Sequence, residues 1–198
     1  MMRSVVIVSL IVLATLSRLV PHGPNFAPLC AIAFFGGMRF HNRWAAFLVP
    51  LLAMLLSDLA IHVGTNLQVF GGWMAKGTGF YPDMIFVYFG VALASLLGVR
   101  LQKSDRPAAV VGGILGSSLV FFLITNFGFW LMVNSYPDAP GWSRPEHTIA
   151  GLLQCFRDAI PFYKMSLLGD VLYGAVLFGG FAALERFVPA LQVRAAQA

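Results

Sequence analysis

Three polar side chains interrupt long apolar runs and are the first candidates for chemistry. Asp58 lies in the run over residues 44–63, Asn126 in 107–133 and Asp170 in 161–187. A carboxylate in mid-membrane costs about 2.5–3.5 kcal/mol on insertion scales, so it usually faces the bundle interior with a partner. At 1.5 Å per residue, Asp170 and Asn126 lie at similar depths of roughly 12–13 Å, and Asp58 lies nearer the helix end that Arg18 shares. Two polar pairs are therefore predicted, Asp170 with Asn126 and Asp58 with Arg18.

Three interpretations of these groups remain open. The pairs can simply hold helices together, because such bonds contribute about 0.6 kcal/mol each. They can also line a ligand cavity, in which case Tyr173 shares the face of Asp170 at i+3. An enzyme using Asp58 and Asp170 as acid and base is disfavoured by their different depths.

Metal and cofactor chemistry finds little support in the sequence. His22, His62 and His147 fall near one side of the predicted bundle, but no two are spaced for a shared metal on a helix. Cys30 and Cys155 form no CxxC pair. Nucleotide-binding and hydrolase motifs are also absent from the sequence. We therefore expect no cofactor, no metal and no enzyme activity.

The composition places the chain in a membrane. Apolar residues make up 59% and charged residues 11%, whereas a soluble domain carries about 25% charged residues. The mean hydropathy is +0.80. The net charge of +5 comes largely from Lys and Arg in short loops, which indicates topology and not a nucleic-acid partner.

The apolar runs predict an all-α integral membrane protein with six transmembrane helices and one domain over residues 1–198. The first run follows Arg3 without a cleavage pattern, so we expect it to stay as a helix. Residues 147–160 are amphipathic and too polar to span, so they are predicted to form an extra interfacial helix. The predicted spans are residues 4–20, 25–38, 44–63, 83–100, 107–133 and 161–187.

Lysine and arginine set the predicted orientation. With the N-terminus inside, short inner loops hold most of the positive charge, as the positive-inside rule requires. Both termini then lie in the cytoplasm, and the long loops rich in Trp, Tyr and Pro lie outside. Small-residue pairs such as Ala27/Ala31 and Gly112/Gly116 either pack helices internally or form a docking face for another membrane protein.

Several segments together resemble a family of uncharacterised bacterial membrane proteins linked to transport, DUF6580. The resemblance covers nearly the whole chain. It rests on residues Pro24–Pro28, Ala31–Gly37, Ala53–Leu59, Phe121–Gly128, Ala159–Phe162 and Leu168–Asp170.

That family is in turn similar to the substrate-binding S components of energy-coupling-factor (ECF) vitamin transporters. This resemblance implies an outward-facing cavity in a bacterial inner-membrane protein, with lid loops after helices one, three and five. It also implies docking of an Ala-x-x-x-Ala pair, here Ala27 and Ala31, on an ECF-type transmembrane coupling subunit with its ATPases. The cobalamin-specific type reaches cobalt with a cysteine near the third outer loop, but residues 59–100 contain none.

The favoured hypothesis is therefore an S-component-like subunit for uptake of a small molecule such as a vitamin or a precursor. A membrane-embedded enzyme and a non-transporting scaffold are the alternatives. The predicted ligand-binding residues are Asn25, Asp58, Trp73, Tyr81, Asn126, Trp130, Asp170 and Tyr173.

Overall fold

The computed structural model describes residues 2–23, 25–70, 80–104, 106–135 and 144–191, and these residues form an all-helical bundle without strands. The fold class is therefore all-α, as predicted. Three short 3-10 turns, Ser17–Leu19, Val133–Ser135 and Pro189–Leu191, extend helix ends. The helices are α1 (Met2–Leu16), α2 (Leu29–Arg39), α3 (Arg43–Asn66), α4 (Met84–Arg100), α5 (Pro107–Met132) and α6 (Ile149–Phe187).

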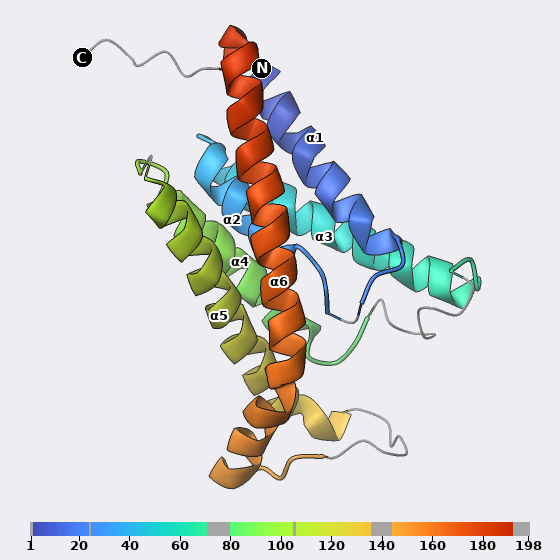
Figure 1. Cartoon of the computed structure of the whole chain (residues 1–198). Coiled ribbons are helices and arrows are strands. Elements are labelled where there is room, and N and C mark those ends of the chain that lie inside the picture. The colour runs from blue at the N-terminus through green and yellow to red at the C-terminus, as the bar shows by residue number, and fades with distance from the viewer. Residues whose placement is uncertain (1, 24, 71–79, 105, 136–143, 192–198) are drawn as a thin grey trace.

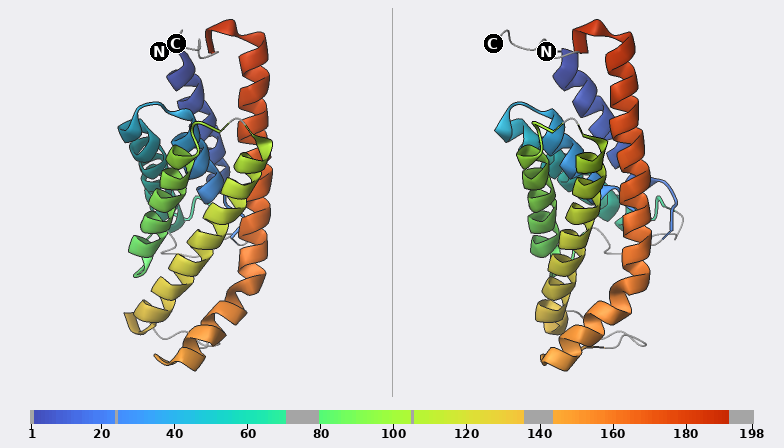
Figure 2. Two further views of the ribbon diagram at one scale, coloured as in Figure 1. Left: turned by 90° about the vertical axis from the view of Figure 1, so that its left-hand side faces the viewer. Right: turned by 60° about the vertical axis from the view of Figure 1, so that its left-hand side comes forward.

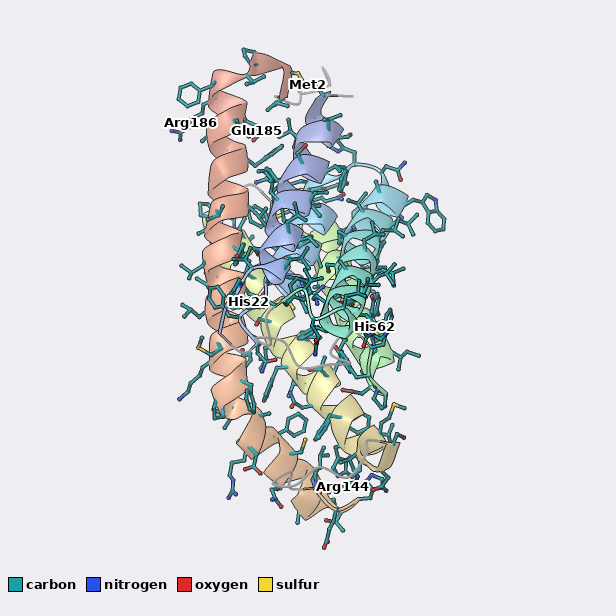
Figure 3. All side chains as sticks on the ribbon, turned by 90° about the vertical axis from the view of Figure 1, so that its right-hand side faces the viewer. Met2, His22, His62, Arg144, Glu185 and Arg186 are labelled. Atoms are coloured by element: carbon teal, nitrogen blue, oxygen red, sulfur yellow. The ribbon has the colours of Figure 1, made fainter. Side chains whose placement is uncertain are left out.

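Successive helices run up and down the bundle (Figures 1 and 2). The start of α1 and the end of α6 lie at one end, and the junction between α5 and α6 lies at the other. Figure 3 shows Met2, Glu185 and Arg186 together at the first end and Arg144 at the opposite end. An ion pair of 2.5 Å between Arg3 and Glu185 ties α1 to α6 there.

Four of the six helical stretches are long and apolar enough to cross a membrane: Met2–Leu19, Arg43–Asn66, Pro107–Ser135 and Ile149–Phe187. The other two, α2 and α4, have 11 and 17 residues, or about 17 and 26 Å at 1.5 Å per residue. A hydrocarbon core is about 30 Å thick. The chain is thus a multi-pass helical membrane protein by the length and composition of its helices, with α2 and α4 shorter than a full span.

The short α2 is the centre of the bundle and contacts all five other α-helices. Residues 30–38 are all buried, as expected for a helix that is apolar on every side. Its closest neighbour is α4, and glycines permit that approach. A Cβ on Gly37 would lie 2.2 Å from the carbonyl oxygen of Ser95, and one on Gly98 would lie 2.4 Å from that of Phe34.

The structure corrects the predicted start of the second helix. Residues 25–28 are not helical, and α2 begins at Leu29 with Pro28 as its N-cap. Asn25 has a φ of 58°, a left-handed conformation that Asn tolerates better than most residues. The nearby prolines disfavour an earlier helix start, because each lacks an N–H donor.

The predicted interfacial helix is also not a separate element. Residues from Ile149 onward belong to α6, which continues through Pro161 to Phe187. Its first turns diverge in direction from the rest (Figure 2). A proline removes one backbone hydrogen bond and bends a helix without always ending it. Thr148 caps the start by accepting a hydrogen bond from the Gly151 amide.

Candidate functional site

A cavity of about 760 Å³ opens in the half of the bundle away from the chain ends. Its walls come from the segment before α2, the start of α4, the second half of α5 and the first half of α6. This volume is within the range of about 300–1,000 Å³ typical of small-molecule sites. The polar, aromatic and sulfur-containing residues that line the cavity are Asn25, Cys30, Tyr81, Asp83, Ser118, Phe121, Phe122, Thr125, Asn126, Phe129, Gln154, Cys155, Asp158, Phe162, Tyr163, Ser166 and Asp170.

Asp170 forms the floor of the cavity and is only 2% exposed. One of its carboxylate oxygens accepts hydrogen bonds from the backbone amides of Cys30, at 3.1 Å, and Ala31, at 3.0 Å. The Ser118 hydroxyl hydrogen-bonds to the same carboxylate. Burial of this charge is therefore compensated by amide and hydroxyl donors from α2 and α5.

These contacts make Asp170 a cap for α2 supplied by another helix. The first amides of a helix have no partner within it, and the N-cap of α2 is Pro28, whose side chain makes no capping hydrogen bond. The Asp170 carboxylate satisfies two of these amides from α6. It also lies at the positive end of the α2 dipole, which favours a negative charge.

The predicted pairing of Asp170 with Asn126 is not formed. Both residues line the cavity, but the Asn126 amide nitrogen donates to the carbonyl oxygen of Phe122 at 2.8 Å. Among the described residues, Asp170 instead accepts hydrogen bonds from the start of α2 and from Ser118. Depth along two helices therefore placed these residues near one cavity without predicting the partner of each.

Aromatic rings form much of the cavity wall. The Phe122 ring packs against Tyr163 with centroids 4.6 Å apart and against Phe156 at 5.8 Å. Phe121 and Phe129 contribute further rings from α5. The cavity thus combines flat apolar walls with a few polar groups, which is the usual composition of a site for an organic molecule.

The mouth of the cavity carries exposed polar and aromatic residues. Asn25, Tyr81, Gln154 and Asp158 are exposed there, and Phe162 is 52% exposed. Partial burial, followed by the charges of the Asp58 and Asp83 carboxylates, raises the pKa of the Tyr81 hydroxyl. Tyr81 is therefore neutral at physiological pH.

Asp58 lies outside this cavity, in a buried ion pair. It accepts a hydrogen bond of 2.6 Å from Arg18 and one of 2.8 Å from the Tyr88 hydroxyl. Arg18 also donates to the Ser57 hydroxyl. The predicted Asp58–Arg18 pair is confirmed, and it joins the end of α1 to α3 and α4. Leu29 lies between the two sites, lining both the large cavity and the small space beside Arg18.

The other predicted ligand-binding residues are divided between the cavity and its surroundings. Asn25 and Tyr81 line it with Asn126 and Asp170. Trp130 instead donates to the Glu146 carbonyl at 2.8 Å, which braces the connection from α5 to α6. Tyr173 packs against Phe26 with ring centroids 6.1 Å apart. Trp73 lies outside the described residues.

The two predicted docking alanines also occupy different surroundings. Ala27 lines the cavity, whereas Ala31 is fully buried inside the bundle. On α5, a Cβ on Gly112 would meet nothing within 4 Å, while one on Gly113 would collide with the Phe34 ring. Internal packing thus uses Gly113, the neighbour of the predicted residue.

Several cavity residues gave no signal in the sequence. Asp158 and Gln154 come from the amphipathic segment, where the sequence suggested an ordinary polar face. Cys30 and Cys155 both line the cavity, although 125 positions separate them in the chain. Their placement depends on α6 packing against α2 and α5, which helix periodicity alone does not specify.

The long apolar helices define a multi-pass helical membrane protein, and the bundle contains a cavity with a polar floor. The chain belongs to the family of unknown function DUF6580, which matches residues 1–191. It is also similar to a protein named as an uncharacterized amino acid permease, YvbW, of Bacillus subtilis (strain 168), at 28% identity over 107 residues. That match covers 48% of this chain and 24% of the permease, so the chain spans about a quarter of that relative. No solved structure matches the chain.

Proposed function

We propose that this chain is a membrane transport protein that binds a small organic substrate in the cavity between α2, α4, α5 and α6 for its uptake. The observation that carries this proposal is the cavity itself, with its aromatic walls and polar floor. The similarity to a protein named as a permease also supports a role in transport.

The finer proposal is an S-component-like role in a bacterial inner membrane, with both termini in the cytoplasm and the cavity facing outward. The positive charge of the turns after α2 and α4 supports this orientation, because those turns lie toward the same end as the start of α1 (Figure 1). A chain with this role binds substrate and requires a separate ECF-type coupling subunit with ATPases for energy. A vitamin or a vitamin precursor is the proposed substrate class.

The first test is the identity of any small molecule that copurifies with the chain. Thr125 lines the cavity from α5, so Thr125→Phe places a ring in the binding volume. Leu123 is on the same helix and is 45% exposed, so Leu123→Phe is a matched control that leaves the cavity unchanged. Mass spectrometry of extracts should show a compound that falls by roughly tenfold or more in Thr125→Phe and is retained in Leu123→Phe.

Equal small-molecule content in all three proteins would count against a binding function. A second measurement separates binding from transport. Proteoliposomes holding the chain alone should bind the compound without accumulating it if the S-component-like role is correct. Accumulation driven by the chain alone would replace that role with independent transport.

A further inference from the structure

The polar groups of the cavity are unevenly divided between donors and acceptors. Asp83, Asp158 and Asp170 line it, whereas no Lys, Arg or His does so among the residues that the structure describes. Arg18, which lies on the other side of Leu29 from the cavity, is paired with Asp58 at 2.6 Å. The described lining therefore has three carboxyl groups and no basic side chain, and Asp158 at the mouth is paired at 3.4 Å with Arg157, an exposed residue outside the lining.

Most side-chain donors that line the cavity are already used on the protein itself. Thr125 donates to the Phe121 carbonyl at 2.9 Å, and Ser166 donates to the Asn25 carbonyl at 3.0 Å. The Asn126 amide nitrogen donates one of its two hydrogens to the Phe122 carbonyl at 2.8 Å. The other lining donors are the hydroxyls of Tyr81 and Tyr163 and the amides of Asn25 and Gln154, and Gln154 also has a contact within the protein. Acceptors therefore predominate.

The N-terminus of α2, where an anion could otherwise bind, is occupied as well. A helix N-terminus attracts anions because its first amides lack partners, and α2 begins at the floor of this cavity. Asp170 already accepts hydrogen bonds from two of those amides, Cys30 and Ala31. A carboxylate or phosphate group on a ligand would find this position filled by the Asp170 carboxyl group.

The walls complement a cation in a second way. The rings of Phe121, Phe122, Phe129 and Tyr163 line the cavity, and aromatic faces attract ammonium groups within about 6 Å of the ring centroid. The volume of about 760 Å³ is suited to an organic molecule and far exceeds that of a bare metal ion. No group of three His, Cys, Asp or Glu in the described part of the chain is placed to hold a metal.

We infer that the substrate of this cavity is an organic cation, an amine with an aromatic or apolar body and without an anionic group. This inference rests on the proposed binding function and specifies its substrate class. The amine replaces the Arg157 guanidinium at Asp158, an exposed ion pair of 3.4 Å that solvent weakens. Its body lies between the aromatic rings.

The test compares three probes that share one aromatic body. Phenethylamine is a cation at pH 7, phenylalanine adds a carboxylate to it, and 3-phenylpropanoate is an anion. Equilibrium dialysis against the full chain in detergent should show phenethylamine binding at least about tenfold more tightly than either of the other two. Its binding should be lost in Thr125→Phe and retained in Leu123→Phe.

A charge-matched pair of variants locates the effect. Asp158→Asn removes a partly exposed carboxylate from the mouth and should weaken phenethylamine binding about two- to fivefold. Glu146→Gln removes the same charge from an exposed residue at the same end of α6, outside the cavity lining, and should leave binding unchanged. Equal weakening by both variants would contradict a contact at Asp158.

The compound that copurifies with the chain tests the charge of the substrate independently of the probes. If the compound lost in Thr125→Phe is a cation at pH 7, the inference is supported, even where phenethylamine itself is too short to bind. If that compound is neutral or anionic, or if phenylalanine or 3-phenylpropanoate binds as tightly as phenethylamine, the inference is overturned and the binding function stands. If no compound depends on the cavity and no probe binds, the binding function itself fails.

Discussion

Asp58 and Asp170 are both buried carboxylates, with 4% and 2% of their surface exposed, but their charges are compensated differently. Asp58 is paired with a full positive charge on Arg18 and bonded to Tyr88. Asp170 has no cation beside it in the described contacts and accepts instead from two amides at the start of α2. One carboxylate belongs to an ion pair and the other caps a helix.

This difference has a consequence for the cavity. A helix dipole corresponds to roughly half a positive charge at its N-terminus, so it offsets only part of the charge on Asp170. The Arg18–Asp58 pair is neutral as a unit and lies behind Leu29, away from the cavity. Of the two carboxyl groups, Asp170 is the one whose described contacts include no cation, and it is the one that lines the cavity.

Breaking the ion pair is expected to have the largest effect on stability. Asp58→Leu leaves the Arg18 guanidinium buried without its carboxylate, and the loss of one partner of such a pair costs about 3–5 kcal/mol. The double variant Arg18→Met/Asp58→Leu removes both charges and should recover most of that loss. The free energy of unfolding, measured by SDS titration in mixed micelles, checks both. A loss below about 1 kcal/mol in the single variant would show that Arg18 reaches water once its partner is gone.

Removing the cap is expected to cost less. Asp170→Leu leaves two buried amides of α2 without an acceptor, and we expect a loss of about 2–3 kcal/mol from the lost cap and the unsatisfied donors. Asp170→Asn retains an acceptor oxygen and should lose about 1 kcal/mol. Hydrogen exchange of the Cys30 and Ala31 amides should quicken most in Asp170→Leu. Unchanged protection of these two amides in Asp170→Leu would contradict the capping role.

The contrast between the two carboxylates also shows what the sequence can and cannot predict. The Asp58–Arg18 pair follows from depth along the first and third apolar runs, because both residues lie close to the same end of the predicted bundle. The cap on α2 does not, because it requires that α6 pack against the start of a helix 140 positions earlier. The starting point of α2 itself depends on where the prolines and the left-handed Asn25 allow a helix to begin.

The same reasoning separates the well-predicted elements from the poorly predicted ones. Long apolar runs such as α3 and α5 agree with their predicted ranges within a few residues, because hydropathy determines them directly. The continuous α6 was not predicted, since a proline after a polar, amphipathic stretch is also typical of a helix break. The cavity was expected only as a region, and its lining by Asp158, Gln154 and Tyr163 follows from the packing of α6, which the sequence pattern leaves open.

The smallest effect on stability is expected from removing the Tyr88 hydroxyl, which donates a hydrogen bond of 2.8 Å to the Asp58 carboxylate. Tyr88→Phe removes a hydrogen bond to a charged group, worth about 1–2 kcal/mol, while the Arg18 contact remains. Tyr173→Phe is the matched control, because the described contacts of Tyr173 are made by its ring, and it should change the free energy of unfolding by less than about 0.5 kcal/mol. Equal losses in the two variants would mean that Arg18 alone stabilises Asp58. A loss confined to Tyr88→Phe would show that α4 is held to α3 through this carboxylate, in contrast to Asp170, whose donors come mainly from the backbone of one helix.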